Sequence, residues 1–435
     1  MCPAVCITGN PQRRAEAGGM RATDVIVVGA GPAGAAAAHT LARAGADVLV
    51  LERAHFPRDK SCGDGVTAHA VDLLADMGVT FDDFTGRGVK TLGGVIGGPS
   101  GGRFRADPPP SPDGKPMACW VVPRVVLDAR VAQSAVDAGA RLAQGCTVSG
   151  LVRDKDIVIE YADGGGAQRV AAKIVIGADG AHSAVARALR VGENGKRHRG
   201  FAIRGYYDDV EGLKDDLEIY YYDKRILPGY GWIFPAGVRR ANVGIGIYTG
   251  ELDRSPRKLR QILDDFIASG PSVAQRMRNA RPVGRPIGWP LPVSTAHRRT
   301  VFDGAMLCGD AASLIDPLTG EGIYTALVSG RSAARAALRA LASGETSADA
   351  LRGHEREWVS IAGGYLTSGR ILKNLVKSAT LMNLIVRRAA ESPYYASRAI
   401  GYGLGTLDRR RALTSIVLKA IFNPSFFIRR SLAKA

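Results

Sequence analysis

Three glycines and one carboxylate near the N-terminus have the types and the spacing needed to bind a dinucleotide. Gly29, Gly31 and Gly34 form a G-x-G-x-x-G pattern, and Glu52 follows them. Glycines at this spacing allow a tight turn and a close approach of the backbone to a pyrophosphate. A carboxylate at this distance can accept hydrogen bonds from both hydroxyls of an adenosine ribose. These four residues predict a site for an adenine dinucleotide, either FAD or NAD.

The segments around these residues predict the strand, turn, helix and second strand that such a site requires. Residues 25–28 are a continuous β-branched run, which is typical of a strand buried on both faces. A second strand is predicted over residues 47–51. The helix between the two strands would begin at the glycines and direct the partial positive charge of its N-terminus at the phosphates.

Two later motifs narrow the cofactor class. The first, IVIGADGAHSAVAR, ends a predicted strand in a glycine-rich turn at Asp179, and the second, MLCGDAASLIDPLTGEGIYTAL, contains Asp310, Pro317 and Gly320. With the N-terminal pattern, these motifs resemble the flavoprotein family of aromatic hydroxylases, halogenases and geranylgeranyl reductases. The resemblance covers about residues 23–345, and it implies FAD as the cofactor.

The resemblance also implies a role for each matching residue. In that family the aspartate at the place of Asp310 binds the ribityl chain of FAD, and an arginine at the place of Arg124 contacts the FAD phosphates. Arg124 could instead form a surface ion pair with Asp128, one helical turn later. A helix that begins near Gly320, after Pro317, would point its amides at the N1–C2=O edge of the flavin. The residues assigned to the cofactor site are Gly29, Gly31, Pro32, Ala33, Gly34, Glu52, Arg53, Cys62, Gly63, Arg124, Asp179, Gly309, Asp310, Pro317, Gly320, Gly322 and Ile323.

Two stretches favour the reductases among the members of this family. The stretch FPRDKSCGDG is similar to theirs, and it implies that Cys62 faces the substrate beside the isoalloxazine ring, although a buried structural cysteine is the alternative. In the stretch PGYGWIFP, strand geometry puts Tyr230, Trp232 and Phe234 on one face. This row is either a sheet core or a substrate wall, and the flavin motifs favour a wall. Halogenases of the family have W-x-W-x-I-P at this place.

These motifs together predict an FAD-dependent reductase that saturates C=C bonds of an isoprenoid chain, either a prenyl quinone such as menaquinone or a geranylgeranyl lipid. Cys62 is the first candidate for the proton donor, with Tyr230 or an ordered water as the alternative. The rings of Tyr230 and Trp232 would stabilise positive charge on the substrate. The alternative is a monooxygenase that hydroxylates a lipophilic aromatic compound. The reductant is left open between NAD(P)H, a ferredoxin-type protein and a quinol.

Composition and charge restrict the surroundings in which this chemistry takes place. No apolar run approaches the ~18 residues that span a bilayer, and six scattered cysteines indicate neither a disulfide framework nor a metal site and suit a cytoplasmic protein. The net charge is +17, and residues 362–435 contain 13 Lys and Arg against 2 Asp and Glu, hence +11 of it. Basic residues between apolar pieces favour peripheral binding to an anionic membrane over a solvated tail. The arginines do not alternate with aromatic residues, so a nucleic-acid partner is not expected.

The predicted fold is α/β, with a discontinuous Rossmann-type FAD-binding domain, an inserted antiparallel substrate sheet and a C-terminal helical region. A tail, disordered or upstream of a true start at Met20, is expected before the first strand. The predicted segments are residues 1–22 for the tail, 23–85, 117–190 and 283–345 for the FAD-binding domain, 86–116 and 191–282 for the substrate domain, and 346–435 for the basic, membrane-facing helical region.

Overall fold

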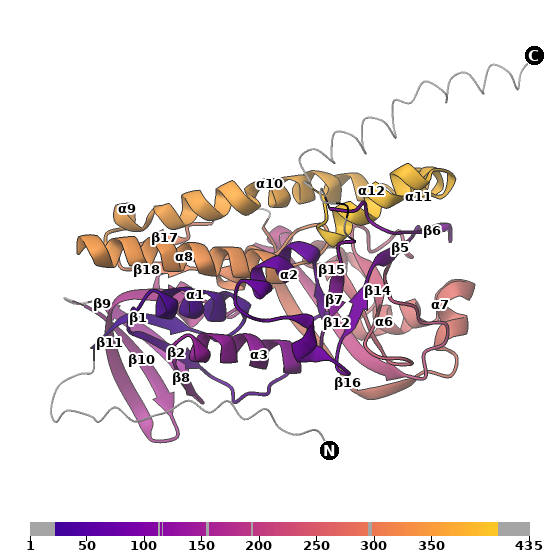
Figure 1. The fold of residues 1–435 in the computed structure, drawn as a ribbon. Helices are drawn as coiled ribbons and strands as arrows, with labels where there is room; N and C mark the ends of the chain where they lie inside the picture. Colours follow the sequence, from indigo (N-terminus) through magenta and orange to yellow (C-terminus); the bar gives the residue numbers. More distant parts are fainter. Residues whose placement is uncertain are drawn as a thin grey trace, which may run out of the picture.

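The computed structural model describes residues 22–407 apart from 112–113, 115, 154–155, 193–194 and 295–297. Within these residues the strands form three sheets (Figure 1). The helices are α1 (Pro32–Arg43), α2 (Ala68–Ala75), α3 (Arg124–Asp137), α4 (Ala184–Ala188), α5 (Thr249–Arg254), α6 (Leu259–Ile267), α7 (Gly270–Met277), α8 (Ile323–Ser343), α9 (Ala348–Leu351), α10 (Gly353–Val376), α11 (Ala379–Glu391) and α12 (Pro393–Leu404).

The first sheet has a parallel centre. Its strands are β1 (Ala22–Val28), β2 (Val48–Glu52), β8 (Arg141–Gln144), β9 (Thr147–Arg153), β10 (Ile157–Asp163), β11 (Gly166–Gly177), β17 (Val301–Phe302) and β18 (Ala305–Leu307). The order is β17-β18-β11-β1-β2-β8, and β1 pairs in parallel with both β2 and β11. β9 and β10 add an antiparallel extension beside β11. The centre is the arrangement that the first glycine pattern predicts.

β1 is buried on both faces, which explains its continuous β-branched sequence. Val25 and Val27 pack into a core with α1, α3 and α8, whereas Ile26 and Val28 pack on the other side with β10, β18 and α10. Parallel strands with both faces covered have such runs because neither face meets water. The carboxyl end of β1 is thereby fixed where the glycine turn begins.

The second sheet lies beside the first and carries the aromatic row. Its strands are β5 (Gly93–Gly97), β6 (Arg103–Ala106), β12 (Arg199–Asp208), β13 (Asp216–Tyr220), β14 (Tyr230–Pro235), β15 (Ala241–Tyr248) and β16 (Arg281–Pro292). Their order is β16-β12-β15-β14-β13-β5-β6. One face packs on α6 and α7, and the other packs under α11 and α12. A small third sheet, made of β3 (Gly65–Val66), β4 (Val89–Thr91) and β7 (Cys119–Val121), lies next to them.

The predicted fold class is confirmed, with two differences in the second sheet. β5 pairs in parallel with β13, whereas the prediction was an antiparallel sheet, because β5 enters from the first insertion beside a strand of the second. β16 carries the sheet to Pro292, past residue 282 where the sequence analysis ended the substrate domain. Residues 1–21 and 408–435, which include most of the predicted tail and part of the predicted basic region, lie outside the described residues.

A buried histidine joins the C-terminal helices to the first sheet. The Nε2 atom of His354 lies 3.0 Å from the carbonyl oxygen of Leu307, and its Nδ1 atom lies 3.3 Å from the Ser332 hydroxyl. Burial lowers the pKa of this imidazole to about 4, against the raising effect of the carbonyl. The ring is neutral in the folded protein, and a carbonyl oxygen can only accept a hydrogen bond. Nε2 therefore carries the proton and is the donor in the hydrogen bond to the Leu307 carbonyl.

This histidine predicts a loss of stability in acid. Between pH 6.5 and pH 4 the unfolded chain binds a proton that the folded chain excludes, so the free energy of unfolding should fall by about 3 kcal/mol through this group. Chemical denaturation across this range should show a smaller decline for His354→Gln than for the wild type. Ser332→Ala, which leaves the ring buried, should keep the wild-type decline. Equal declines in wild type and His354→Gln would contradict the assignment.

Candidate active site

Two cavities meet where the first and second sheets adjoin. The more polar of the two, here called the polar cavity, is lined by the glycine turn, by Glu52 and by the turn at Asp179. The other is mainly apolar and runs from the segment before α8 to α12. Both cavities are lined by Lys60, Ser61, Arg124 and Trp289. A ligand that spans the two would therefore pass these four side chains.

The glycine turn is packed so closely that side chains are excluded at two of its positions. Gly29 has a φ of +95°, and a Cβ there would lie 2.5 Å from the carbonyl oxygen of Ala178. A Cβ on Gly34 would lie 1.8 Å from the Gly29 carbonyl oxygen. At Gly31, which lines the polar cavity, the nearest atom to a built Cβ is 3.8 Å away. The turn thus holds α1 against β1 and leaves its backbone open to a ligand.

Glu52 is oriented by the backbone on both sides of it. Its Oε2 accepts the N–H of Ala30 over 2.9 Å, and its Oε1 accepts the N–H of Ala54 over 3.0 Å. The Nε atom of Arg58 lies 3.5 Å from Oε1. The carboxylate lines the polar cavity beside Arg53. Each carboxylate oxygen can accept more than one hydrogen bond, so the group retains acceptor capacity for a ribose hydroxyl.

The segment before α8 lines the apolar cavity. Gly320, Gly322 and Ile323 line it, and so does Asp310. Asp316, which is fully buried, accepts the N–H groups of Leu318 and Thr319 and thereby shapes the turn. The helix begins at Ile323, three residues after the predicted start. Its N-terminal dipole favours negative charge at this end of the cavity.

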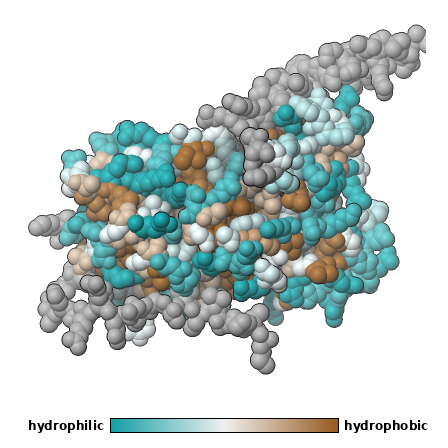
Figure 2. All heavy atoms as spheres, viewed as in Figure 1, coloured by the Kyte–Doolittle hydropathy of each residue, from teal (hydrophilic) through white to brown (hydrophobic). Residues whose placement is uncertain are grey.

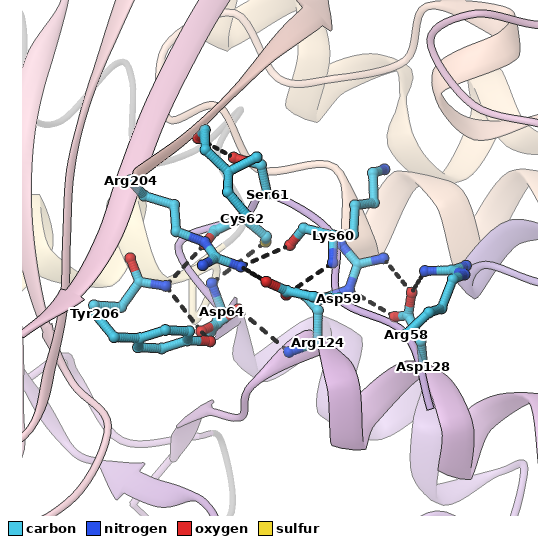
Figure 3. Close-up of polar contacts among 12 residues, drawn as sticks. Arg58, Asp59, Lys60, Ser61, Cys62, Asp64, Arg124, Asp128, Arg204 and Tyr206 are labelled. Carbon is cyan, nitrogen blue, oxygen red and sulfur yellow. Dashed lines mark hydrogen bonds and ion pairs between the residues drawn. The ribbon is translucent and has the colours of Figure 1, made fainter. Parts of the chain in front are cut away.

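Residues 56–65 form a loop, here called the cysteine loop, that crosses from the first sheet to the second (Figure 3). Three consecutive charged side chains of the loop each contact a different part of the fold. Arg58 pairs with α3, Asp59 with β12 and Lys60 with Asp310, and the shortest N–O distances are 2.8, 2.6 and 3.1 Å. Cys62 follows and lines the apolar cavity.

Arg124 forms the ion pair with Asp128 that was the alternative to a phosphate contact, but the pair is buried instead of lying on the surface. Its Nε donates to Oδ1 over 2.6 Å and its Nη2 to Oδ2 over 2.8 Å. Burial disfavours the charge of Arg124, yet Asp128 and the neighbouring Cys62 outweigh it and raise the pKa of the guanidinium. The cysteine loop covers the pair through Arg58. Helical spacing alone does not reveal this cover, so it suggested a solvent-exposed pair. Arg124 still lines both cavities.

The aromatic row lies on one wall of the apolar cavity. The ring centroids of Tyr230 and Trp232 are 6.2 Å apart, and those of Trp232 and Phe234 are 6.3 Å apart. A Cβ on Gly63 would lie 3.1 Å from Phe234 and 3.4 Å from Trp232, so the cysteine loop lies directly on the row. The Tyr230 hydroxyl donates to the carbonyl of Thr319. The row therefore joins the second sheet to the segment before α8.

Four residues assigned to the cofactor site serve packing, and a fifth caps a helix. Ala33 and Gly309 lie where α1 meets α8, since a Cβ on Gly309 would be 3.1 Å from the Ala33 side chain. Pro317 is buried, and its carbonyl accepts the Tyr248 hydroxyl over 2.5 Å. The Asp179 carboxylate lines the polar cavity and accepts the N–H groups at the start of α4. Gly34, described above, is the fourth packing residue.

Four residues of the site were missed by the sequence analysis. Asp64 lies two positions after Cys62, and Tyr206 and Asn242, which contact it, come from β12 and β15. Trp289 of β16 lines both cavities. Asp64 stands inside the quoted C-G-D-G motif, so its carboxyl was available as a signal. The other three come from distant segments and belong to no local motif.

The residues present fit FAD. A carboxylate, an open glycine turn, Asp310 and a helix N-terminus follow one another along the joined cavities. The Nε1 atom of Trp289 is buried and, among the described residues, has no hydrogen-bond partner. A buried indole N–H at the junction of the cavities is suited to donate to a bound ligand.

Comparison with known proteins identifies the same cofactor. A family model described as an FAD binding domain matches residues 22–363. Menaquinone reductase of Mycobacterium tuberculosis is 38% identical over 327 residues, which are 72% of this chain and 75% of the relative. Digeranylgeranylglycerophospholipid reductase 1 of Methanopyrus kandleri is 35% identical over 341 residues, 77% of this chain and 85% of the relative.

Solved structures share the fold. A geranylgeranyl bacteriochlorophyll reductase-like protein from Thermoplasma acidophilum has a TM-score of 0.78 at 24% identity, covering 92% of this chain and 100% of that one. The flavin-dependent brominase Bmp2 has a TM-score of 0.74 at 19% identity, covering 92% and 98%. The brominase shares the fold and has a different chemistry, so the assignment rests on the closer sequence relatives. The chain therefore belongs to the FAD binding domain family and, within it, to the geranylgeranyl reductase group of FAD-dependent oxidoreductases.

Proposed function

We propose that this protein is an FAD-dependent reductase that saturates C=C bonds of an isoprenoid chain, carried by a prenyl quinone such as menaquinone or by a geranylgeranyl lipid. One observation supports this function most: an apolar cavity leads from Cys62 and the N-terminus of α8, along the aromatic row, to α12. The names of the two relatives given above, menaquinone reductase and digeranylgeranylglycerophospholipid reductase, indicate substrates with such chains. In this proposal the isoprenoid chain lies in the apolar cavity, and FAD lies in the adjoining polar cavity.

The apolar cavity suits a long hydrocarbon chain. Beyond the aromatic row its walls are Leu217 and Ile219 of β13 and Ile400 and Leu404 of α12. Each buried CH₂ of a substrate contributes about 0.8 kcal/mol to binding. The charged residues that line the cavity, such as Lys60, lie at the end near the FAD site. The apolar walls favour burial of the isoprenoid chain, and the charged residues are confined to the end of the cavity next to the cofactor site.

The reaction requires a hydride and a proton at neighbouring carbons. Reduced FAD, when bound, supplies the hydride from its N5 atom. An isolated alkene has no carbonyl to take up negative charge, so the proton must arrive before or with the hydride, and positive charge develops on the tertiary carbon. The faces of Tyr230 and Trp232 stabilise such a charge by about 1–2 kcal/mol each in a site without water.

Cys62 is the proton donor in this proposal. Its thiol lines the cavity, and the guanidinium of Arg124 beside it can stabilise the thiolate that remains. Tyr230 is the poorer candidate, because its hydroxyl donates to the Thr319 carbonyl and burial raises the pKa of the phenol. The order of the two candidates is the one proposed from the sequence. The reductant is NAD(P)H, a ferredoxin-type protein or a quinol.

Peripheral binding to an anionic membrane would bring the cavity to its lipid substrate. Lys377, directly after α10, and Arg387 on α11 are exposed, and Ile371 of α10 and Tyr394 of α12 are exposed hydrophobic residues of the same helical region. On the face that Figure 2 shows, hydrophobic side chains form small patches in a largely hydrophilic surface, so attraction by charge would dominate. In the part of the chain that the structure describes, a helix with the length and hydrophobicity to cross a bilayer is absent.

The proposed function predicts that the reduced lipid forms in the absence of molecular oxygen. The FAD-loaded protein, reduced with dithionite under anaerobic conditions and given menaquinone or a geranylgeranyl lipid, should add two hydrogen atoms per reduced bond. Lipid mass spectrometry measures this mass increase, and a reaction without protein is the control. A hydroxylated product that forms only with oxygen would contradict the proposal and support the monooxygenase instead.

Cys62→Ala should keep bound FAD and its visible absorbance while alkene reduction slows at least about 100-fold, the scale of a lost general acid. Cys119→Ala is the matched control, since that thiol is buried in the core under α12. It should retain the rate of the wild type. Full turnover by Cys62→Ala would exclude the cysteine as the acid.

Charge reversal should release the protein from anionic vesicles. Truncation is unsuitable as a test because α12 forms a wall of the apolar cavity. Lys377→Glu with Arg387→Glu should lower recovery in flotation with phosphatidylglycerol liposomes at least about tenfold, since each basic residue near the surface contributes about 1 kcal/mol. Arg43→Glu with Arg278→Glu, exposed elsewhere, has the same net charge change and should float like the wild type. Equal recovery of both double variants would refute membrane binding through α10 and α11.

A further inference from the structure

A buried carboxyl within the cysteine loop has no role in the reaction as described so far. Asp64 is fully buried, and its φ of +66° lies in the left-handed region. Residues other than glycine adopt this conformation rarely, and it persists where surrounding contacts fix it. In this conformation the backbone N–H of Asp64 donates to the Sγ atom of Cys62 over 3.3 Å.

Three donors hold the carboxylate in place (Figure 3). The Tyr206 hydroxyl and the Nδ2 atom of Asn242 both donate to Oδ2, the latter over 2.8 Å, and the backbone N–H of Arg124 lies 3.4 Å from Oδ1. The Asp64 carbonyl accepts the N–H of Val122 over 3.0 Å. The left-handed turn is thus held from β12, β15 and the start of α3 at once.

Asn242 extends this arrangement to the aromatic row. Its Nδ2 atom also donates to the carbonyl of Cys62 over 2.8 Å, and its Oδ1 accepts the Nε1–H of Trp232 over 3.0 Å. The side chain is fully buried, so these contacts have no competition from water. One amide therefore connects the proton donor, the carboxyl and the ring that faces the substrate.

The carboxyl is held by neutral donors, because the nearby guanidinium groups are directed at other carboxylates. Arg204 pairs with Asp59, and Arg124 pairs with Asp128. Burial raises the pKa of Asp64 to about 6, against the lowering effect of the donors and charges around it. The titratable and charged groups that face it are Tyr206, Arg204, Arg124 and Cys62.

We propose that Asp64 is the positioning residue of the thiol: while ionised, it holds Cys62 and Trp232 in a fixed relation through the amide of Asn242, and its protonation releases them. The donors of Tyr206 and Asn242 occupy both acceptor sites of Oδ2, so a proton on Oδ2 displaces one of them or turns the Tyr206 hydroxyl into an acceptor, and a proton on Oδ1 places a new donor beside the backbone N–H of Arg124. In each case the hydrogen bonds that hold the turn are rearranged. The inference rests on the proposed function for its kinetic readout. Its second readout, the reactivity of the thiol, does not.

The test compares three variants of the FAD-loaded, full-length protein. Asp64→Asn keeps the shape of the side chain but replaces one acceptor oxygen by a donor, and Tyr206→Phe is the milder variant that removes one donor to the carboxylate. Tyr220→Phe is the matched control, because this hydroxyl also donates to a buried carboxylate of the second sheet, that of Glu218.

The first measurement is the rate at which iodoacetamide alkylates Cys62, quantified on its peptide by mass spectrometry at neutral pH. Loosening the turn and removing the negative charge beside the sulfur should both raise this rate, so Asp64→Asn should react about fivefold faster, the scale of one lost hydrogen bond. Tyr206→Phe should fall between Asp64→Asn and the wild type, and Tyr220→Phe should match the wild type.

The second measurement is the pH dependence of kcat for isoprenoid reduction. The wild-type rate should fall in acid with a midpoint near pH 6. This acid limb should move up by about one pH unit in Tyr206→Phe, which loses a donor to the ionised form, and should disappear in Asp64→Asn. It should stay in place in Tyr220→Phe.

The outcomes separate this inference from the proposed function. Unchanged alkylation of Cys62 and an unchanged acid limb in Asp64→Asn and Tyr206→Phe would overturn the positioning role while reduction itself stands. If the wild type reduces no isoprenoid chain, the proposed function fails, and the alkylation rates still decide the role of Asp64. If Asp64→Asn does not fold, Tyr206→Phe against Tyr220→Phe carries both measurements.

Discussion

Three ion pairs, each to a different element, hold the cysteine loop in place between the two sheets. Arg58 is paired with α3, Asp59 with β12 and Lys60 with the 3₁₀ turn at Asp310. Two of the partners, Asp128 and Arg204, are buried, so loss of their loop partner would leave a charge with little access to water. These pairs fix the loop to both sheets, and they thereby fix Cys62 at the apolar cavity.

Close packing gives the same region its shape. The Trp232 ring lies so close to β15 that a Cβ on Gly244 would be 2.3 Å from it, and the cysteine loop reaches the same ring through Gly63. Glycines on both sides let the sheet, the ring and the loop approach without intervening side chains. The aromatic row is consequently packed against β15 and the cysteine loop, and it also lines the apolar cavity.

The sequence predicted the parts of the site that local patterns encode. The glycine turn and Asp310 belong to motifs with fixed spacing, and the aromatic row follows from the two-residue period of a strand. Asn242 could not be found in this way, because its partners are brought to it by the pairing of β12, β14 and β15 and by the cysteine loop. The surface pair given as the alternative for Arg124 turns out to be buried for a related reason: helical spacing gives a pair but says nothing of what covers it. The predicted contact of Arg124 with the FAD phosphates stays a prediction.

The distribution of charge explains why two titratable groups can lie two residues apart and still differ in role. Arg124 directs its guanidinium at Asp128 and lies beside Cys62, whereas only its backbone N–H approaches Asp64. A cation that paired with Asp64 would keep that carboxyl ionised at every physiological pH. With neutral donors, the Asp64 carboxyl can take up a proton when the pH falls. The positive charge of Arg124 can meanwhile act on the sulfur of Cys62. In the proposed mechanism the same arginine thus separates a group that holds the site, Asp64, from a group that reacts in it, Cys62.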